Sequence, residues 1–306
     1  MRWMGRRESS NVEDRRGEGG GGFGGLGGGM GGFSRGGGLG GIPIGRGGGI
    51  GGIVLVGVIL LGGWLLGVDP STLLSGGTSD TTTSQPGTVG APSDKEGKFV
   101  ATVLADTEDT WAKLLPAQAG KSYRNPTLVL FDGQTGSACG LAQSAVGPFY
   151  CPNDERLYID LSFYRELAQK LGAPGDFAEA YVIAHEVGHH VQNVLGTLPD
   201  VDRRRAAAGE TESNRLSVRL ELQADCYAGV WAHETDTQGT LEPGDIDEAL
   251  TAAAAVGDDK LQKEGQGYVV PDSFTHGTAA QRSAWFKRGY DTGKISACDT
   301  FGAGSL

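Results

Sequence analysis

The chain has 306 residues and a formal net charge of −11, with 26 Lys and Arg against 37 Asp and Glu. This length allows one sizeable domain with appendages, and the acidic balance argues against nucleic acid as a partner. Glycine accounts for 54 residues, and the excess is concentrated in residues 17–52, which therefore cannot bury a core. We expect residues 1–46 to form a disordered tail.

The apolar stretch 47–68 contains no charged residue and is long enough to span a membrane as a helix, which needs about 20 residues. A buried core segment or a cleaved signal peptide is the alternative, but the preceding leader is long and no small-residue cleavage site follows. The leader carries seven arginines, and basic flanks favour the cytoplasm. We therefore expect a single-pass anchor in a cell membrane, with residues 1–46 cytoplasmic and the rest of the chain outside.

All four cysteines follow the apolar stretch. An even number in an oxidising compartment indicates two disulfides. Of the three pairings, we predict Cys139–Cys151, which closes a loop containing Gly and Pro, and Cys226–Cys298. Zinc binding is an alternative, but no Cys-x-x-Cys pair is present; buried free thiols are another.

The remaining sequence predicts a linker and one domain. Residues 69–97 are rich in Ser, Thr, Gly and Pro, as linkers are, and the globular domain is expected at 98–306. Periodicity and turn signals predict helices at 98–115, 162–172, 177–195, 213–234, 244–262 and from about 279, and strands at 126–131 and 156–162. Candidate capping boxes start at Asp176, Asp245 and Thr278. The expected fold class is α+β, mostly helical with a small sheet.

Three histidines and a glutamate lie in the apolar segment 181–193, YVIAHEVGHHVQN. His185 and His189 are four residues apart, so on a helix both rings can reach one tetrahedral Zn²⁺ at about 2.1 Å. Glu186 lies beside them and can act as general base. An interior polar network is the alternative, but burying these groups without partners costs several kcal/mol. His190 points about 100° away from His189 and is expected to lie at the surface or to support the site.

The third metal ligand must come from elsewhere in the chain. The pattern H-E-x-x-H-x-x-G-x-x-H is excluded because Gln192 and Leu195 occupy its last two fixed positions. Glu221 and Asp225, four residues apart in an apolar stretch, offer carboxylates from a later helix. We predict Glu221 as the third ligand and Asp225 as acceptor for the distal N–H of a ligand histidine. Without the histidine motif they would be interpreted as surface acids. Cys226 lies about 140° around the helix from Glu221 and should not bind the same metal.

Several segments of the chain resemble one known family. They are SAVGPFYCP, YIDLSF, AHEVGHHVQ, ELQADCYAGVW, DSFTHGTAAQRSAWFKRGYDTG and the leader MRWMGRRESSNVEDRR, and they are similar to the bacterial putative neutral zinc metallopeptidases. The resemblance implies a zincin-like domain with a gluzincin-like site, a Zn²⁺ cofactor and a location at the bacterial cell membrane.

A more distant resemblance is to membrane-associated zinc proteases in which H-E-x-x-H is followed by E-x-x-x-D. These proteins often carry a downstream His-Pro and an Arg, for which this chain offers His276 and Arg282, with Gly277 in place of the proline. The resemblance implies His276 as a donor to the oxyanion of the transition state; the alternative is a loop histidine that caps the next helix. It also implies that the strand at YIDLS is a sheet edge that binds extended peptide.

These observations together predict a zinc-dependent peptidase that acts on a peptide or protein. His185, His189 and Glu221 would hold the metal, which lowers the pKa of water towards about 7, and Glu186 would accept the proton. Two alternatives stay open: a non-catalytic membrane scaffold with a structural zinc, and a zinc hydrolase of a non-peptide amide. The sequence does not specify the natural substrate or the oligomeric state.

Overall fold

The computed structural model describes residues 1–17, 87–90, 92–143 and 147–302. The predicted membrane span at 47–68 and most of the predicted linker lie outside these residues. Within the described ranges, no helix combines the length and the apolar character that crossing a bilayer requires.

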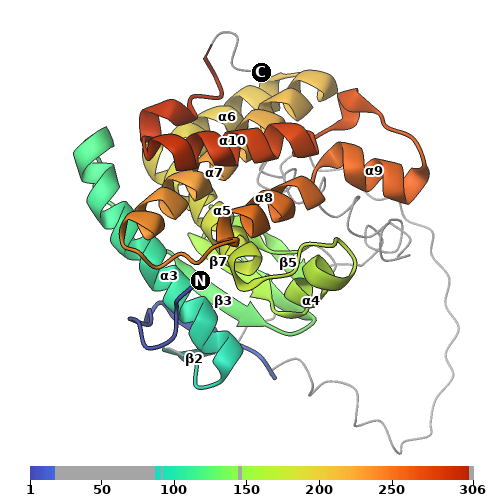
Figure 1. Cartoon of the computed structure of the whole chain (residues 1–306). Coiled ribbons are helices and arrows are strands. Elements are labelled where there is room, and N and C mark those ends of the chain that lie inside the picture. Colours follow the sequence, from blue (N-terminus) through green and yellow to red (C-terminus); the bar gives the residue numbers. More distant parts are fainter. Residues whose placement is uncertain (18–86, 91, 144–146, 303–306) are drawn as a thin grey trace, which may run out of the picture.

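A five-stranded mixed sheet forms the base of the molecule (Figure 1). Its order is β2 (Thr88–Val89), β1 (Val12–Asp14), β3 (Thr127–Phe131), β7 (Arg156–Asp160) and β6 (Phe149–Cys151). Strands β1, β3 and β7 run parallel, whereas β2 and β6 at the two edges are antiparallel to their neighbours. The strands predicted at 126–131 and 156–162 are therefore confirmed, and both lie in the interior of the sheet.

The two faces of the sheet bury different sets of side chains, as strand alternation requires. Leu128, Leu130, Leu157 and Ile159 join the main core with the helices. Val129, Phe131 and Tyr158 belong to a smaller cluster on the opposite face. A hairpin of β4 (Gln134–Ser137) and β5 (Gly140–Gln143) contributes Ala142 to that cluster, and the predicted disulfide Cys139–Cys151 links the hairpin to β6.

Helices make up most of the described chain and pack together next to the sheet (Figure 1). They are α3 (Lys95–Leu114), α4 (Ser162–Gln169), α5 (Asp176–Leu195), α6 (Thr197–Ala207), α7 (Glu210–Thr237), α8 (Asp245–Ala255), α9 (Asp258–Gln266) and α10 (Ala279–Thr292), with a π-helical turn at Leu115–Ala119 and 3₁₀ turns at Pro271–Ser273 and Ile295–Cys298. The expected α+β, mostly helical class is confirmed. The capping box at Thr278 forms, but α5 and α8 start after glycines without a side-chain cap, so the boxes predicted at Asp176 and Asp245 are wrong.

Two glycines allow α7 to approach its neighbours closely. A Cβ atom on Gly188 of α5 would lie 2.9 Å from the carbonyl oxygen of Ala224 on α7. A Cβ atom on Gly289 of α10 would collide with the backbone of Cys226, also on α7. Helix α7 is therefore in direct backbone contact with both α5 and α10, which brings side chains of all three helices to a common point.

Residues 1–17 belong to the folded domain, which corrects the prediction of a disordered tail for this part of the chain. Val12 is fully buried, and β1 pairs with β3 on one side and β2 on the other. Three arginines of residues 1–17 form ion pairs with the rest of the domain: Arg6 with Asp106, Arg7 with Glu108 and Asp109, and Arg16 with Asp94. Opposite charges thus fix the leader along α3.

This sheet also constrains the predicted membrane orientation. Residues 12–14 hydrogen-bond with residues 88–89 and 128–130, so the leader and the domain must lie on the same side of any membrane. The expectation of a single span with a cytoplasmic leader and an external domain is incompatible with this pairing. The reason is that strands of one sheet cannot be separated by a bilayer.

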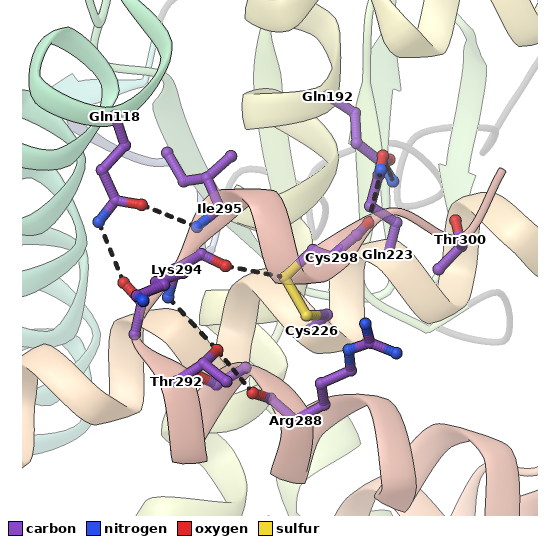
Figure 2. The surroundings of a disulfide bond; sticks show 12 residues. Gln118, Gln192, Gln223, Cys226, Arg288, Thr292, Lys294, Ile295, Cys298 and Thr300 are labelled. Atoms are coloured by element: carbon purple, nitrogen blue, oxygen red, sulfur yellow. Dashed lines mark hydrogen bonds between the residues drawn. A yellow bond between two sulfur atoms is a disulfide. The ribbon is translucent and has the colours of Figure 1, made fainter. Parts of the chain in front are cut away.

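The second predicted disulfide, Cys226–Cys298, is also confirmed. It joins α7 to the 3₁₀ turn at Ile295–Cys298 near the end of the described chain (Figure 2). Both cysteines are buried, and no described cysteine is free.

Candidate metal centre

Helices α5 and α7 bring three candidate ligands together, as the sequence predicts. His185 and His189 lie one turn apart on α5, and Glu221 faces them from α7. The Nε2 atom of His185 is 3.2 Å from one carboxylate oxygen of Glu221, and that of His189 is 3.5 Å from the other. One ligand atom from each of the three residues lies within 4.8 Å of the others.

This donor set fits a zinc ion. Two imidazole nitrogens and one carboxylate are the ligands of a common class of catalytic zinc site, in which the fourth position stays open. His185 and Glu221 are almost fully buried, with 6% and 8% of their surface exposed. Such a concentration of polar groups in an apolar interior is costly unless the groups are paired or bind a cation.

Asp225 supports His185 in the way that the sequence predicts. The Nδ1–H group of His185 donates to the carboxylate of Asp225 at 2.8 Å, which leaves Nε2 facing Glu221. The hydroxyl of Tyr181 donates to the same carboxylate at 2.5 Å, and Arg282 of α10 forms two bonds to it at 2.8 and 2.9 Å. Arg282 therefore belongs to this network, and its role is to hold Asp225.

The charges of this network shift the pKa values of its members. Burial favours the neutral form of Asp225, but Arg282 and His185 lower the pKa of its carboxyl to about 2. Burial likewise opposes a charge on His185, yet Asp225 and Glu221 raise the pKa of its ring to about 10 in the metal-free protein. The network thus attracts a positive charge to the position between His185 and Glu221.

The other candidate ligand, His189, has a neutral support that sequence reasoning missed. Its Nδ1 atom lies 2.9 Å from the side-chain oxygen of Gln192. Gln192 lies three residues further along α5, so helical spacing alone could have placed it on the same face. His190 is fully buried away from the cluster: its Nε2–H donates to the carbonyl of Arg124, and its Nδ1 accepts from Tyr150. His190 is therefore buried rather than at the surface, and its hydrogen bonds go to Arg124 and Tyr150 rather than to the candidate ligands.

Glu186 projects beside the ligand histidines without a direct partner. Its surface is 7% exposed, and it has no hydrogen bond to any residue that the structure describes. Burial raises the pKa of its carboxyl, with His185 and His189 opposing the shift. A carboxylate in this position is available to accept a proton from a water molecule.

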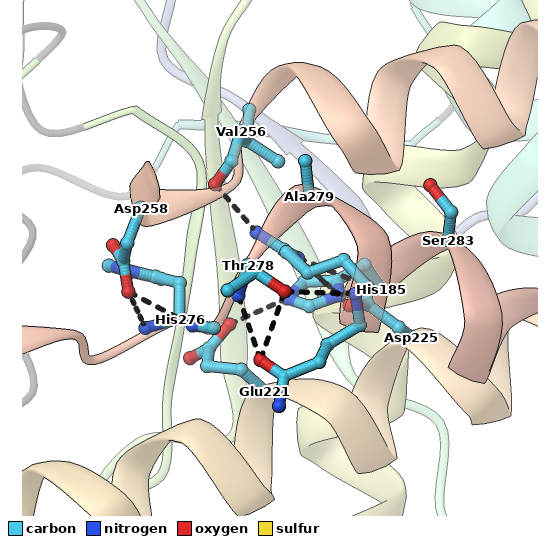
Figure 3. Close-up of polar contacts among 12 residues, drawn as sticks. His185, Glu221, Asp225, Val256, Asp258, His276, Thr278, Ala279 and Ser283 are labelled. Atoms are coloured by element: carbon cyan, nitrogen blue, oxygen red, sulfur yellow. Dashed lines mark hydrogen bonds and ion pairs between the residues drawn. The ribbon is translucent and has the colours of Figure 1, made fainter. Parts of the chain in front are cut away.

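His276 reaches the site from the loop before α10 (Figure 3). Its ring interacts electrostatically with Glu221, and its Nδ1 atom lies 3.1 Å from Asp258. Asp258 is fully buried and also accepts hydrogen bonds from the backbone N–H groups of Thr275, His276 and Gly277. Asp258 thereby fixes both the loop and the ring, which sequence reasoning did not anticipate; its place at the start of α9 gave no signal.

One strand expectation near the site is wrong. The strand at YIDLS, β7, is paired on both sides by β3 and β6, so it is not a sheet edge. The edge next to the metal helix is β6, whose Tyr150 accepts a hydrogen bond from Asn193 and donates one to His190 on α5. Cys226 is bonded to Cys298 and does not join the cluster, as predicted.

The fold and the site together define a helix-rich α+β protein with a His-His-Glu cluster that could hold a metal ion and with an adjacent glutamate. Residues 1–301 match the family described as putative neutral zinc metallopeptidase, and the chain belongs to this family. It is 51% identical over 304 residues to "Uncharacterized protein YpfJ" of Escherichia coli K12, covering 99% of each chain. It is 45% identical over 261 residues to "Uncharacterized protein Rv2575" of Mycobacterium tuberculosis H37Rv, covering 79% of this chain and 86% of the relative. No solved structure matches the chain significantly.

Proposed function

We propose that the chain is a zinc-dependent peptidase in which His185, His189 and Glu221 hold the metal. The observation that carries this proposal is the convergence of three ligand atoms within 4.8 Å beside a buried carboxylate, Glu186, that has a raised pKa. The family to which the chain belongs supports the same class of activity.

The roles of the protein groups follow from their positions. Zinc, when bound, would supply a Lewis acid that activates water and polarises the scissile carbonyl. Glu186 accepts the proton of the attacking water and delivers it to the leaving amine. His276 donates a hydrogen bond to the developing oxyanion, and Asp258 holds the ring of His276 in place for this task. Asp225 and Arg282 hold His185 in the orientation that leaves Nε2 free for the metal.

The substrate is a peptide bound in extended form along β6. This strand is the edge of the sheet within the described residues, and it contacts α5 through Tyr150. A peptide that adds to this edge by main-chain hydrogen bonds would lie beside the helix that carries the metal ligands.

The compartment proposed for the domain is an oxidising one, because both pairs of cysteines form disulfides. Residues 1–17 would share that compartment, since β1 is part of the sheet. A contact between residues 47–68 and a membrane stays a prediction from the sequence.

The test is the substitution Glu186→Gln in the full chain, since a fragment that starts at residue 98 would lack β1 and β2. We expect hydrolysis of a mixed peptide library to fall by about 10² to 10⁴-fold, because general-base catalysis typically contributes that much. Zinc content should stay unchanged. Glu179→Gln, two turns earlier on α5, is the matched control and should keep full activity.

Other outcomes would favour the alternatives. If wild-type protein cleaves no peptide in a chelator-sensitive way but hydrolyses a cell-wall or lipid amide, the substrate class is wrong. If Glu186→Gln changes no activity and no cellular phenotype while zinc is bound, the metal is structural and the protein is a scaffold.

A further inference from the structure

Two buried side-chain amides, those of Gln192 and Gln223, form a hydrogen-bonded relay from His189 to the C-terminal end of the described polypeptide. The side-chain oxygen of Gln192 faces His189 Nδ1 at 2.9 Å, and its amino group donates to the carbonyl of Leu220 at 2.7 Å and to the side-chain oxygen of Gln223 at 3.2 Å. The amino group of Gln223 in turn donates to the carbonyl of Cys298 at 2.9 Å (Figure 2). Gln192 is fully buried and Gln223 is 6% exposed.

The direction of every hydrogen bond in this relay is fixed by two backbone carbonyls, that of Cys298 at its far end and that of Leu220 beside Gln192. A backbone carbonyl only accepts, so Gln223 must present its amino group to Cys298 and its oxygen to Gln192. Gln192 must then use its amino group towards Gln223 and Leu220, which leaves its oxygen for His189. An oxygen acceptor there requires a proton on Nδ1 of His189. The Nε2 atom, which faces Glu221, is then free to bind a metal.

The far end of this relay, the backbone carbonyl of Cys298, is itself held in place. Cys298 is bonded covalently to Cys226 of α7, which directly follows Asp225 and lies in the same helix as Glu221. Two residues later, the hydroxyl of Thr300 donates to the carbonyl of Arg219, and the guanidinium of Arg219 donates to the carbonyl of Thr300. The carbonyl of Cys298 therefore has a fixed position relative to the helix that carries the third ligand.

We propose that Gln192 and Gln223 are positioning residues that relay the fixed carbonyl of Cys298 to His189 and select the ring tautomer that binds zinc. This inference rests on the proposed zinc site. It assigns a function in metal binding to the disulfide-linked segment Cys298–Thr300, which contains no metal ligand.

The experiment measures zinc affinity by competition with a chelator, together with the melting temperature of the metal-free full chain. We expect Gln192→Leu to weaken zinc binding by about 10 to 100-fold, the usual cost of losing a group that orients a ligand. Gln223→Leu should lie between wild type and Gln192→Leu, because Gln192 keeps its bond to Leu220.

A conservative variant separates positioning from packing. Gln192→Glu keeps an oxygen for the Nδ1–H of His189 but loses the amino group that donates to Leu220 and Gln223. We expect it to bind zinc at least tenfold more tightly than Gln192→Leu, while its metal-free melting temperature falls at least as far. A merely structural role would make zinc affinity follow the melting temperature, and that result would overturn the proposal.

The chain also offers a matched control for the loss of an amide. Gln118 forms two hydrogen bonds near the same disulfide, to the carbonyl of Gly293 and the N–H of Ile295, but none to the relay (Figure 2). Gln118→Leu should leave zinc affinity unchanged. If wild type binds zinc and Gln192→Leu binds it equally well, the positioning role is wrong; if wild type binds no zinc, the proposed function itself fails.

Discussion

The two histidines of the candidate metal centre have supports of opposite character. His185 is held by charges, since its Nδ1–H donates to Asp225, which is in turn bonded to Arg282 and Tyr181. His189 is held by neutral amides that end at a backbone carbonyl. Both arrangements leave an Nε2 atom facing Glu221, so the same ligand geometry is reached by two different physical means.

The difference predicts which support contributes more to folding. Breaking a buried ion pair leaves an uncompensated charge in the interior and typically costs about 3–5 kcal/mol. Losing a neutral hydrogen bond typically costs about 1–3 kcal/mol when a buried partner is left unsatisfied. The His185 side should therefore be important for the stability of the whole domain, and the His189 side mainly for metal binding.

Arg282→Met should have the largest effect on stability, because it removes the guanidinium that forms two hydrogen bonds to the buried carboxylate of Asp225. We expect the free energy of unfolding, measured by urea denaturation of the metal-free chain, to fall by about 3–5 kcal/mol. Arg288→Met, on the same helix, is the control: Arg288 is exposed and stacks on Trp285, a contact worth about 0.5–1 kcal/mol. If Arg282→Met costs no more stability than Arg288→Met, the charged support of His185 does not stabilise the domain in the way proposed.

A smaller effect on stability is expected from the carboxyl of Glu179, whose negative charge is not compensated by a cation as that of Asp225 is. Burial, and then Asp176, Glu96 and Glu248, raise the pKa of Glu179 to about 7, in contrast to the lowered pKa of Asp225. A raised carboxyl pKa means that stability is lost as pH rises from about 4.5 to about 7, because the unfolded state releases this proton first. Above that window the loss stays constant.

Glu179→Gln removes this charge and should stabilise the domain at pH 8 by on the order of 1 kcal/mol, a value reduced for the partial exposure of the side chain. At pH 4.5 or below, the difference between variant and wild type should vanish. Urea denaturation at both pH values measures it. A variant that is less stable than wild type at pH 8 would show that the carboxylate is compensated after all.

Local features of the sequence were sufficient to predict the central part of the site. His185 and His189, and likewise Glu221 and Asp225, are four residues apart on one helix, so helical periodicity alone places each pair on one face. Both disulfides were also predicted, because four cysteines allow few pairings. Strand β3 was predicted because its apolar residues form a short run, and β7 because apolar and polar residues alternate along it.

What the sequence could not give depends on contacts between distant residues. Strand β1 pairs in parallel with β3, more than a hundred residues away, and its neighbouring glycine tract favoured the interpretation of the leader as disordered. The arginines of the leader were interpreted as a membrane-orientation signal, whereas two of them, Arg6 and Arg7, pair with acids of α3. The supports Gln192, Gln223 and Asp258 were missed because an amide or carboxylate acquires such a role only through its partners in the fold.

The most direct test of the account is a zinc titration of the metal-free full chain, with His189→Ala measured alongside. We expect one zinc per chain with a single tight site in the wild type, and loss of that site in the variant, because one of three converging ligands is removed. Absence of zinc binding by the wild type, or equally tight binding by His189→Ala, would contradict the assignment of this centre.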